Sequence, residues 1–403
     1  MSRKWHPSQS RESAAGIWLV PALLIATLFQ NYYDLSAILD GEKLALYAYE
    51  GPLIFKLGKD AIYITLLAVV ARRAFKFQQS PMTDYALMTF CIIAMLFVFS
   101  ALVNGPIVAL LGIRWSLPFL LFFILRDWAR AIERKQAIRW LMVGMITCLA
   151  AQIYQLFNMP PVFGEVLPGI PARTPGIFIA PNSTAFFACA SAAFILALSG
   201  GLGKFSAVCI ALAIIISLLA QSGTGMIVSF ILGFRALTSK RPAIFWTISL
   251  LIVLATVPNL DSLTQRDDYV SASGGGRLKV LADITQKSAL EIHNFGVFTN
   301  AANLQSDNPK DQVAADSLVA SWIGNFGVAA PLLFALTCLF ITFNMRKVDW
   351  KIAAPCAITF AFFSMTTIVF EAFPMNIFVA IGLWVSQTPR SQANHPHQNQ
   401  IIS

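Results

Sequence analysis

The sequence contains few charged residues. Only 12% of its 403 residues are Asp, Glu, Lys or Arg, whereas about 25% is usual for a soluble domain. Hydrophobic residues make up 57% of the chain, and most of them fall in long runs. This composition excludes an ordinary soluble enzyme and predicts a polytopic membrane protein.

Several familiar sites are also missing. The six cysteines all fall inside apolar segments, so the sequence offers neither a disulfide framework nor a CxxC metal site, and we expect them to be small core residues. It contains no His/Cys cluster, DxD-like pair or P-loop, so we expect no metal ion and no cofactor. The net charge of +9 does not indicate nucleic acid, because Lys and Arg gather in the cytoplasmic loops of membrane proteins.

The apolar runs predict an all-α protein with about twelve transmembrane helices, since a helix needs about 20 apolar residues to cross the membrane, and fewer where protein shelters it. The predicted spans are Ala14–Phe29, Leu53–Val70, Tyr85–Val103, Ile107–Leu125, Ala137–Phe157, Gly176–Leu198, Phe205–Ala220, Gly225–Leu237, Ala243–Val257, Ser317–Phe343, Ile352–Phe370 and Pro374–Val385. Nine of them lie in residues 1–257 and three in residues 317–387. Residues 258–316 form one long polar loop between these groups, and residues 388–403 form a polar tail that we expect to be disordered.

The basic residues predict the orientation of the spans. They gather in alternate connections: Arg72, Arg73 and Lys76; Arg126, Arg130, Arg134 and Lys135; Lys204; Lys240 and Arg241; and Arg346, Lys347 and Lys351. Such connections stay in the cytoplasm, whereas a long loop crosses the membrane largely regardless of its charge. We therefore expect both termini in the cytoplasm and the 258–316 loop outside it.

Two polar features lie near the outer ends of predicted spans. Arg114 is inside a span, where a guanidinium either faces a cavity or an anion or snorkels to the headgroups. Lys56, Lys59 and Asp60 lie at the outer start of the second span. They belong either to a site or to a salt-bridged rim at the membrane interface.

A third feature is the turn that leads into the sixth span. Arg173 precedes Gly176, and Pro181 and Asn182 lie just inside the apolar run. Pro and Asn can leave a helix locally broken around a site. The alternative is a simple kink, with Asn182 bonded to a neighbouring helix.

The long polar loop is the fourth feature. The run Ser273 to Gly276 is flexible and delivers Arg277, whose guanidinium suits bidentate binding of phosphate unless it is merely solvated. His293 is the one histidine outside the termini, and histidine is the side chain that exchanges protons near neutral pH. It is either a general base or a passive surface residue. Together the four features suit an anionic, phosphate-bearing substrate at the outer membrane surface, handled without nucleotide hydrolysis.

The order of the motifs resembles that of the O-antigen ligase and Wzy-type O-antigen polymerase superfamily. Gly176-Ile-Phe-Ile-Ala-Pro-Asn182 looks like the family's G-x-F-x-N-P-N turn, with Ala180 in place of the first Asn. Gly276-Arg277 looks like the G-R that opens the external loop, and His293-Asn-Phe-Gly-Val297 resembles a following glycine-containing segment. The stretch from Asp316 to Gly327 is similar to the family's end of the loop and start of the next span.

Two departures from the family's pattern bear on function. Gln221-Ser-Gly-Thr224 falls where many members have Ser-Arg, so one expected basic contact is missing. Asp316 falls where ligases carry a histidine, which argues against the strict ligase role.

The resemblance implies glycosyl transfer at the outer face of the bacterial inner membrane, from an undecaprenyl-pyrophosphate-linked oligosaccharide. On this basis we expect Arg277, Arg173 and Arg114 to bind the pyrophosphate, with Gly276 and Asn182 supporting them. The other expected partners are membrane lipid and a chain-length regulator or export protein. The leading function is a polymerase of exopolysaccharide or O-antigen repeat units. The alternatives are an O-antigen ligase with a lipid A-core acceptor and, from another class, a secondary transporter or lipid-linked oligosaccharide flippase.

Two residues are candidates for the base that takes the acceptor's proton. Histidine suits neutral pH better than an unperturbed Asp, which favours His293. Asp316 directly precedes the tenth span, so we expect the membrane to anchor it. Partial burial there would raise the pKa of its carboxyl group toward a value useful for a base. His293 lies in the middle of the loop, in a segment that the family treats as structural. The sequence therefore ranks Asp316 ahead of His293.

Overall fold

The computed structural model of the protein describes residues 9–40, 58–65, 68, 81–158, 173–201, 203–238, 279–299, 315, 317–344 and 348–385. All regular secondary structure in these ranges is helical, and no strand occurs within them. The predicted all-α class is therefore confirmed. The predicted ninth span, half of the second span, most of the polar loop and the polar tail lie outside the described residues.

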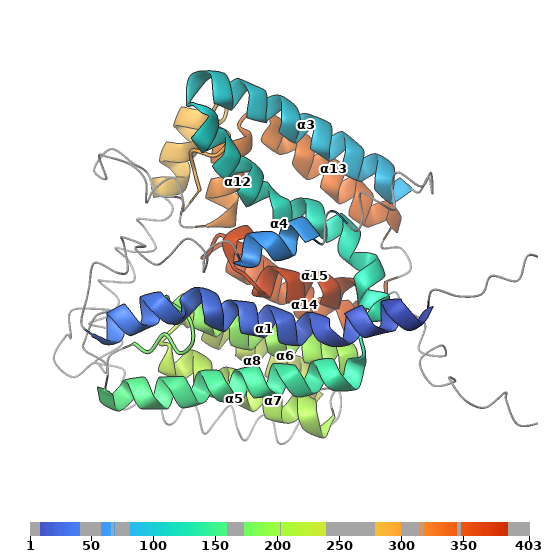
Figure 1. The fold of residues 1–403 in the computed structure, drawn as a ribbon, viewed down its shortest axis with the longest axis vertical. Coiled ribbons are helices and arrows are strands. Elements are labelled where there is room, and N and C mark those ends of the chain that lie inside the picture. Colours follow the sequence, from blue (N-terminus) through green and yellow to red (C-terminus); the bar gives the residue numbers. More distant parts are fainter. Residues whose placement is uncertain are drawn as a thin grey trace, which may run out of the picture.

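The helices form two layers joined by a central pair (Figure 1). Their bounds are α1 Gln9–Leu39, α3 Pro81–Val103, α4 Pro106–Ala131, α5 Arg134–Asn158, α6 Pro181–Ser199, α7 Lys204–Leu219, α8 Gly223–Thr238, α12 Leu318–Phe326, α13 Ala329–Asn344, α14 Trp350–Ser364, the 3-10 turn η4 Val369–Glu371, and α15 Met375–Val385. Further short helices cover residues 58–65 and 279–288. In Figure 1, α1 and α5 to α8 lie below, α3, α12 and α13 lie above, and α14 and α15 lie between.

The core is centred on α6. Every side chain from Thr184 to Leu198 is buried, and many of them are alanines, which let neighbouring helices approach closely. Phe186 stacks on Phe363 of α14 with ring centroids 4.4 Å apart, and Phe194 stacks on Phe378 of α15 at 5.8 Å. On its other side α15 packs against α4, which packs in turn against α3 of the upper layer, so α15 joins the two layers.

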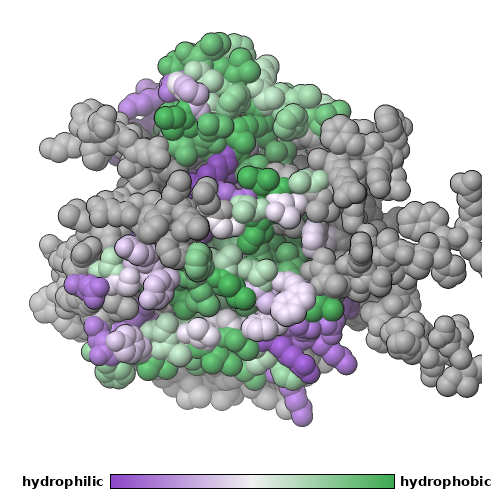
Figure 2. Space-filling model, in the orientation of Figure 1, coloured by the Kyte–Doolittle hydropathy of each residue, from purple (hydrophilic) through white to green (hydrophobic). Residues whose placement is uncertain are grey.

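The apolar surface and helix lengths fit a membrane protein. Three segments are long and apolar enough to cross a membrane, Gly16–Ala37, Arg134–Asn158 and Pro181–Ser199, and the bent pair α12 and α13 makes up to four. The other apolar helices found among the described residues are shorter. On the face in Figure 2, hydrophobic residues cover most of the upper part and continue down the centre, and hydrophilic residues gather toward the two ends of the lower layer.

The predicted span Ser317–Phe343 is not one continuous helix. The chain forms two helices, α12 and α13, which meet at an angle of 119°. Gly327 lies at the bend with a φ of 48°, and a Cβ there would overlap the backbone carbonyl of Glu291, so glycine is required. The indole Nε1 of Trp322 donates a hydrogen bond to the Ala330 carbonyl at 3.1 Å and closes the bend. Counting apolar residues could not detect this break.

Two smaller predictions also need correction. The predicted eleventh span Ile352–Phe370 is too long, because α14 ends at Ser364 and the chain then turns through η4 to reach α15. Four cysteines are buried as predicted, but Cys91 of α3 and Cys338 of α13 are exposed.

Candidate functional site

One end of the bundle gathers polar contacts between distant parts of the chain. The Asn104 amide donates a hydrogen bond to the His293 carbonyl, the Arg173 Nε donates to the Ala220 carbonyl at 3.2 Å, and the Leu318 N–H donates to the Thr367 carbonyl at 3.1 Å. We call this end, on the left in Figure 1, the polar end. The predicted site residues that the structure describes fall into three groups.

The first group is a cluster of four charged residues around Arg114, which we call the charged cluster: Lys59, Asp60, Arg114 and Glu371. The Arg114 Nε lies 3.0 Å from each carboxylate oxygen of Asp60. Lys59 lies close enough to Arg114, Asp60 and Glu371 to interact electrostatically with all three. The cluster thus combines two cations and two carboxylates from the helix 58–65, α4 and η4.

The charged cluster lies within the bundle. Arg114 is eight residues from the start of α4 at Pro106, which corresponds to about 12 Å along the helix axis. The Asp60 side chain is only 16% exposed. Arg114 is therefore ion-paired within the protein, and simple snorkelling to the headgroups does not describe it.

Neighbouring hydrogen bonds hold the charged cluster in place. The Asn376 amide nitrogen donates to the Tyr63 hydroxyl at 2.7 Å and to the Phe370 carbonyl at 2.9 Å. These bonds join the helix 58–65 to α15 and to η4, which carries Glu371. Among the described residues, the terminal nitrogens of Arg114 make no hydrogen bond. The guanidinium fork therefore remains available to two oxygens of an anion.

The second group is the turn that carries Arg173. The Arg173 Nη2 donates to the Asn182 Oδ1 at 3.1 Å, so Asn182 bonds to this turn. Gln155 brackets the Gly176 backbone, accepting from its N–H and donating to its carbonyl, each at 2.7 Å. Gln152 donates to the Thr174 carbonyl at 3.1 Å. Arg173 is therefore fixed between the start of α6 and the end of α7.

The predicted start of the sixth span at Gly176 is wrong, and so is the predicted break or kink at Pro181. α6 begins at Pro181, and Pro is at its first position. Proline fits there because the missing N–H would have no partner inside the helix. The preceding residues form a turn, in which Gly176 has a φ of 62°.

The third group is the segment of residues 291–299, which holds His293. The carbonyl of Phe295 accepts a hydrogen bond from the Ser100 hydroxyl at 2.6 Å. Asn325 of α12 accepts from the N–H groups of Gly296 and Phe298 at 2.9 and 3.1 Å, and it donates to the Phe298 carbonyl at 3.0 Å. Although His293 is in the middle of the predicted loop, its segment is held by α3 and α12.

The His293 side chain is 37% exposed, and its Nε2 lies 3.7 Å from the Glu291 Oε2. Glu291 also accepts a hydrogen bond from the Asn294 amide. The imidazole is thus solvent-accessible beside a carboxylate that is itself held in place. This arrangement suits proton exchange with a hydroxyl group of a substrate.

The structure places Arg114, Arg173 with Asn182, and His293 in three separate groups. No hydrogen bond or ion pair between described residues joins Arg114, Arg173 and His293 to one another. Three predicted site residues, Gly276, Arg277 and Asp316, lie outside the described residues.

Glu371 is a residue of the charged cluster that the sequence motifs did not indicate. It is the one acidic residue between Trp350 and Val385, and a carboxylate within an apolar segment is a signal of function in a membrane protein. Tyr63 and Asn376 were missed as well. Their pairing joins residues 313 positions apart, which no local pattern encodes.

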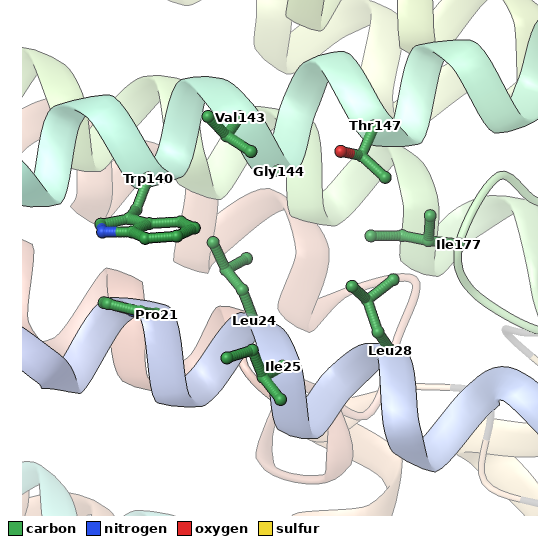
Figure 3. Close-up of a pocket in the computed structure, with 9 residues that line it drawn as sticks. All are labelled: Pro21, Leu24, Ile25, Leu28, Trp140, Val143, Gly144, Thr147 and Ile177. Atoms are coloured by element: carbon green, nitrogen blue, oxygen red, sulfur yellow. The ribbon is translucent and has the colours of Figure 1, made fainter.

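A separate groove lies between α1 and α5. Figure 3 shows that it is lined by apolar side chains, among them Leu24 and Leu28 of α1 and Trp140 and Val143 of α5, with Ile177 at one end. This lining suits hydrocarbon and offers no acid–base chemistry. Across the described residues, no three His, Cys, Asp or Glu side chains gather closely enough to hold a metal ion.

Comparisons with known proteins give no relative. No protein-family model, curated protein or solved structure matches the sequence.

Proposed function

We propose that the protein is a glycosyltransferase of the bacterial inner membrane, which polymerises exopolysaccharide or O-antigen repeat units. Its donor is an oligosaccharide linked to undecaprenyl pyrophosphate, and transfer takes place at the outer face of the membrane. The observation that carries this proposal is the position of Arg114 in the charged cluster, where Asp60 holds the Nε and leaves the terminal nitrogens for an anion.

The chemistry requires cations near the leaving group. The acceptor hydroxyl attacks the anomeric carbon, and the bond from that carbon to the pyrophosphate oxygen breaks, so undecaprenyl pyrophosphate departs with the bonding electrons. Fixed positive charges stabilise the negative charge that develops on the departing oxygen. We assign this role to Arg114, Arg173 and Arg277, with Asn182 orienting Arg173 and Gly276 supporting Arg277.

The acceptor hydroxyl must also lose its proton. We assign His293 as the base and reverse the order that the sequence suggested. The sequence favoured Asp316 because a catalytic side chain should lie on a rigidly held segment. His293 meets this requirement, because Asn104 holds its carbonyl and Asn325 holds the backbone that follows. Glu291 orients the imidazole through the contact at 3.7 Å.

The distribution of charge supports the proposed orientation. Arg235 donates hydrogen bonds to the carbonyls of Trp350 and Lys351 at 3.2 and 3.3 Å, at the end of the bundle opposite the polar end (Figure 1). Arg134 and Lys204 begin helices at that same end. Basic residues concentrated at one end favour the cytoplasm for that end, which leaves the polar end outside. There the donor, membrane lipid and a chain-length regulator or export protein would meet the chain, and nucleic acid has no part.

The test is to identify the glycan that accumulates when the gene is deleted. A polymerase predicts single repeat units on lipid pyrophosphate in the outer leaflet. Accumulation in the inner leaflet would instead indicate a flippase. Full-length polymer that fails to reach lipid A-core would indicate a ligase, and either result would refute the proposal.

A further inference from the structure

We infer that Lys59 binds phosphate, and that its ammonium group and the terminal nitrogens of Arg114 together hold a phosphate group of a membrane lipid. The phosphate lies between the helix 58–65 and α4. The identification of that lipid as undecaprenyl pyrophosphate rests on the proposed function, whereas the phosphate chemistry rests on the charged cluster itself.

The two cations, Lys59 and Arg114, are paired unequally within the protein. The Arg114 Nε lies 3.0 Å from both oxygens of Asp60, so this carboxylate is already engaged. Lys59 interacts electrostatically with Arg114, Asp60 and Glu371, yet it forms no ion pair or hydrogen bond within the part of the chain that the structure describes. An ammonium carries three donors. Lys59 is partly buried, and a partly buried ammonium with none of its donors engaged by the described residues suits an anionic ligand.

The positive charges of Lys59 and Arg114 also repel each other. Two cations close together inside an apolar bundle repel each other more strongly than they would in water. An anion that accepts hydrogen bonds from both side chains offsets this repulsion and forms a charge-assisted hydrogen bond with each of them. The guanidinium supplies a planar fork and the ammonium a compact point charge, which is a common combination for phosphate oxygens.

The charged cluster is held in place by hydrogen bonds within the protein before any ligand binds. Asn376 joins Tyr63 of the helix 58–65 to the Phe370 carbonyl beside Glu371. Asp60 fixes the Arg114 guanidinium from the same helix that carries Lys59. The site therefore needs little rearrangement to bind, which favours affinity. Glu371 acts as a positioning residue that orients the ammonium without touching the ligand.

The experiment measures lipid binding to the full-length protein in phosphatidylethanolamine nanodiscs. Undecaprenyl pyrophosphate and phosphatidylglycerol are titrated separately. For Lys59→Gln we expect a Kd about tenfold weaker, the loss of one charge-assisted contact, while Lys59→Arg keeps most of the affinity. The matched control is Lys279→Gln, since Lys279 is exposed on the helix 279–288. Weakened binding of either lipid supports the inference, and the lipid that is affected identifies the source of the phosphate. Unchanged binding of both lipids overturns it.

A measurement on the wild-type protein covers the case in which Lys59→Gln fails to fold. Bound undecaprenyl pyrophosphate should protect Lys59 from an amine-reactive label several-fold relative to Lys279, whereas equal labelling of Lys59 with and without lipid would refute the site. Because this lipid carries no glycan, the result does not depend on transferase activity. If Lys59 is protected but the deletion strain makes normal polymer, the binding site stands and the proposed function falls.

Discussion

Arg114 has a structural role in the bundle, and we propose a functional role for it as well. Its Nε is committed to Asp60, so the ion pair fixes the guanidinium in the bundle. The remaining donors retain the planar geometry that matches two phosphate oxygens. Arg114 therefore differs from Arg173, whose Nε and Nη2 both bond within the protein.

The first prediction concerns the shape of this guanidinium. Arg114→Lys should lower polymer formation about 100-fold, as expected for loss of a group that stabilises developing charge, because an ammonium cannot replace the fork. Polymer is measured in membranes with matched protein content. Arg139→Lys, an exposed substitution on α5, should leave it unchanged. Near-normal polymer from Arg114→Lys would mean that Arg114 supplies charge alone.

The second prediction concerns His293 as the base. His293→Ala should lose activity, and added imidazole should restore part of it, because a small diffusible base can replace the missing side chain at an accessible position. Imidazole should not rescue Arg114→Ala, which lacks a cation. Full activity in His293→Ala, together with loss in Asp316→Asn, would return the role of base to Asp316.

At the scale of elements, the segment 291–299 and α12 act as one unit at the polar end. The Asn325 side chain accepts from two backbone N–H groups and donates to the Phe298 and Ser321 carbonyls. Gly112 of α4 allows the close approach of this unit, because a Cβ there would lie 2.6 Å from the Phe295 ring. The position of His293 thus depends on contacts from three helices.

The third prediction tests this unit. Asn325→Leu should lower the free energy of unfolding by about 2 kcal/mol or more, because the N–H groups of Gly296 and Phe298 would stay buried without acceptors. The readout is the thermal unfolding midpoint in detergent. Asn158→Leu is the control, since Asn158 is exposed near the end of α5. Equal midpoints for the two variants would show that Asn325 does not stabilise the contact between the segment 291–299 and α12.

Most helices could be predicted from the sequence, because long apolar runs specify them locally. The predicted Tyr85–Val103 and Phe205–Ala220 correspond closely to α3 and α7. The bend between α12 and α13 could not be predicted, because it depends on Gly327 meeting the Glu291 carbonyl. The anchoring of His293 and the charged cluster were also out of reach. Both depend on contacts between residues far apart in the sequence.

At the scale of the whole molecule, the bundle separates two chemical environments. The turn before α6 and the segment 291–299 lie at the polar end, whereas Arg134 and Lys204 begin helices at the other end and Arg235 lies in the last turn of α8 (Figure 1). The apolar surface between the two ends spans the membrane in the proposed orientation (Figure 2). This separation would let the chain bind a lipid-linked donor on one side of the membrane only.

The fourth prediction tests the orientation. A reporter that is active only outside the cytoplasm should work when fused near Gly275 and fail when fused near Arg130, because the basic connections remain in the cytoplasm. A reporter active only in the cytoplasm should give the reverse pattern. A cytoplasmic signal at Gly275 would refute the proposed site of reaction.

The central claim is that this chain alone joins lipid-linked repeat units into polymer. The most direct measurement is reconstitution of the purified protein in liposomes with the lipid-linked glycan isolated from the deletion strain, followed by separation of the products by size. The account predicts a ladder of products that grow by one repeat unit, with release of undecaprenyl pyrophosphate and no ladder from Arg114→Ala. Unchanged glycan in the presence of wild-type protein, or an equal ladder from Arg114→Ala, would contradict it.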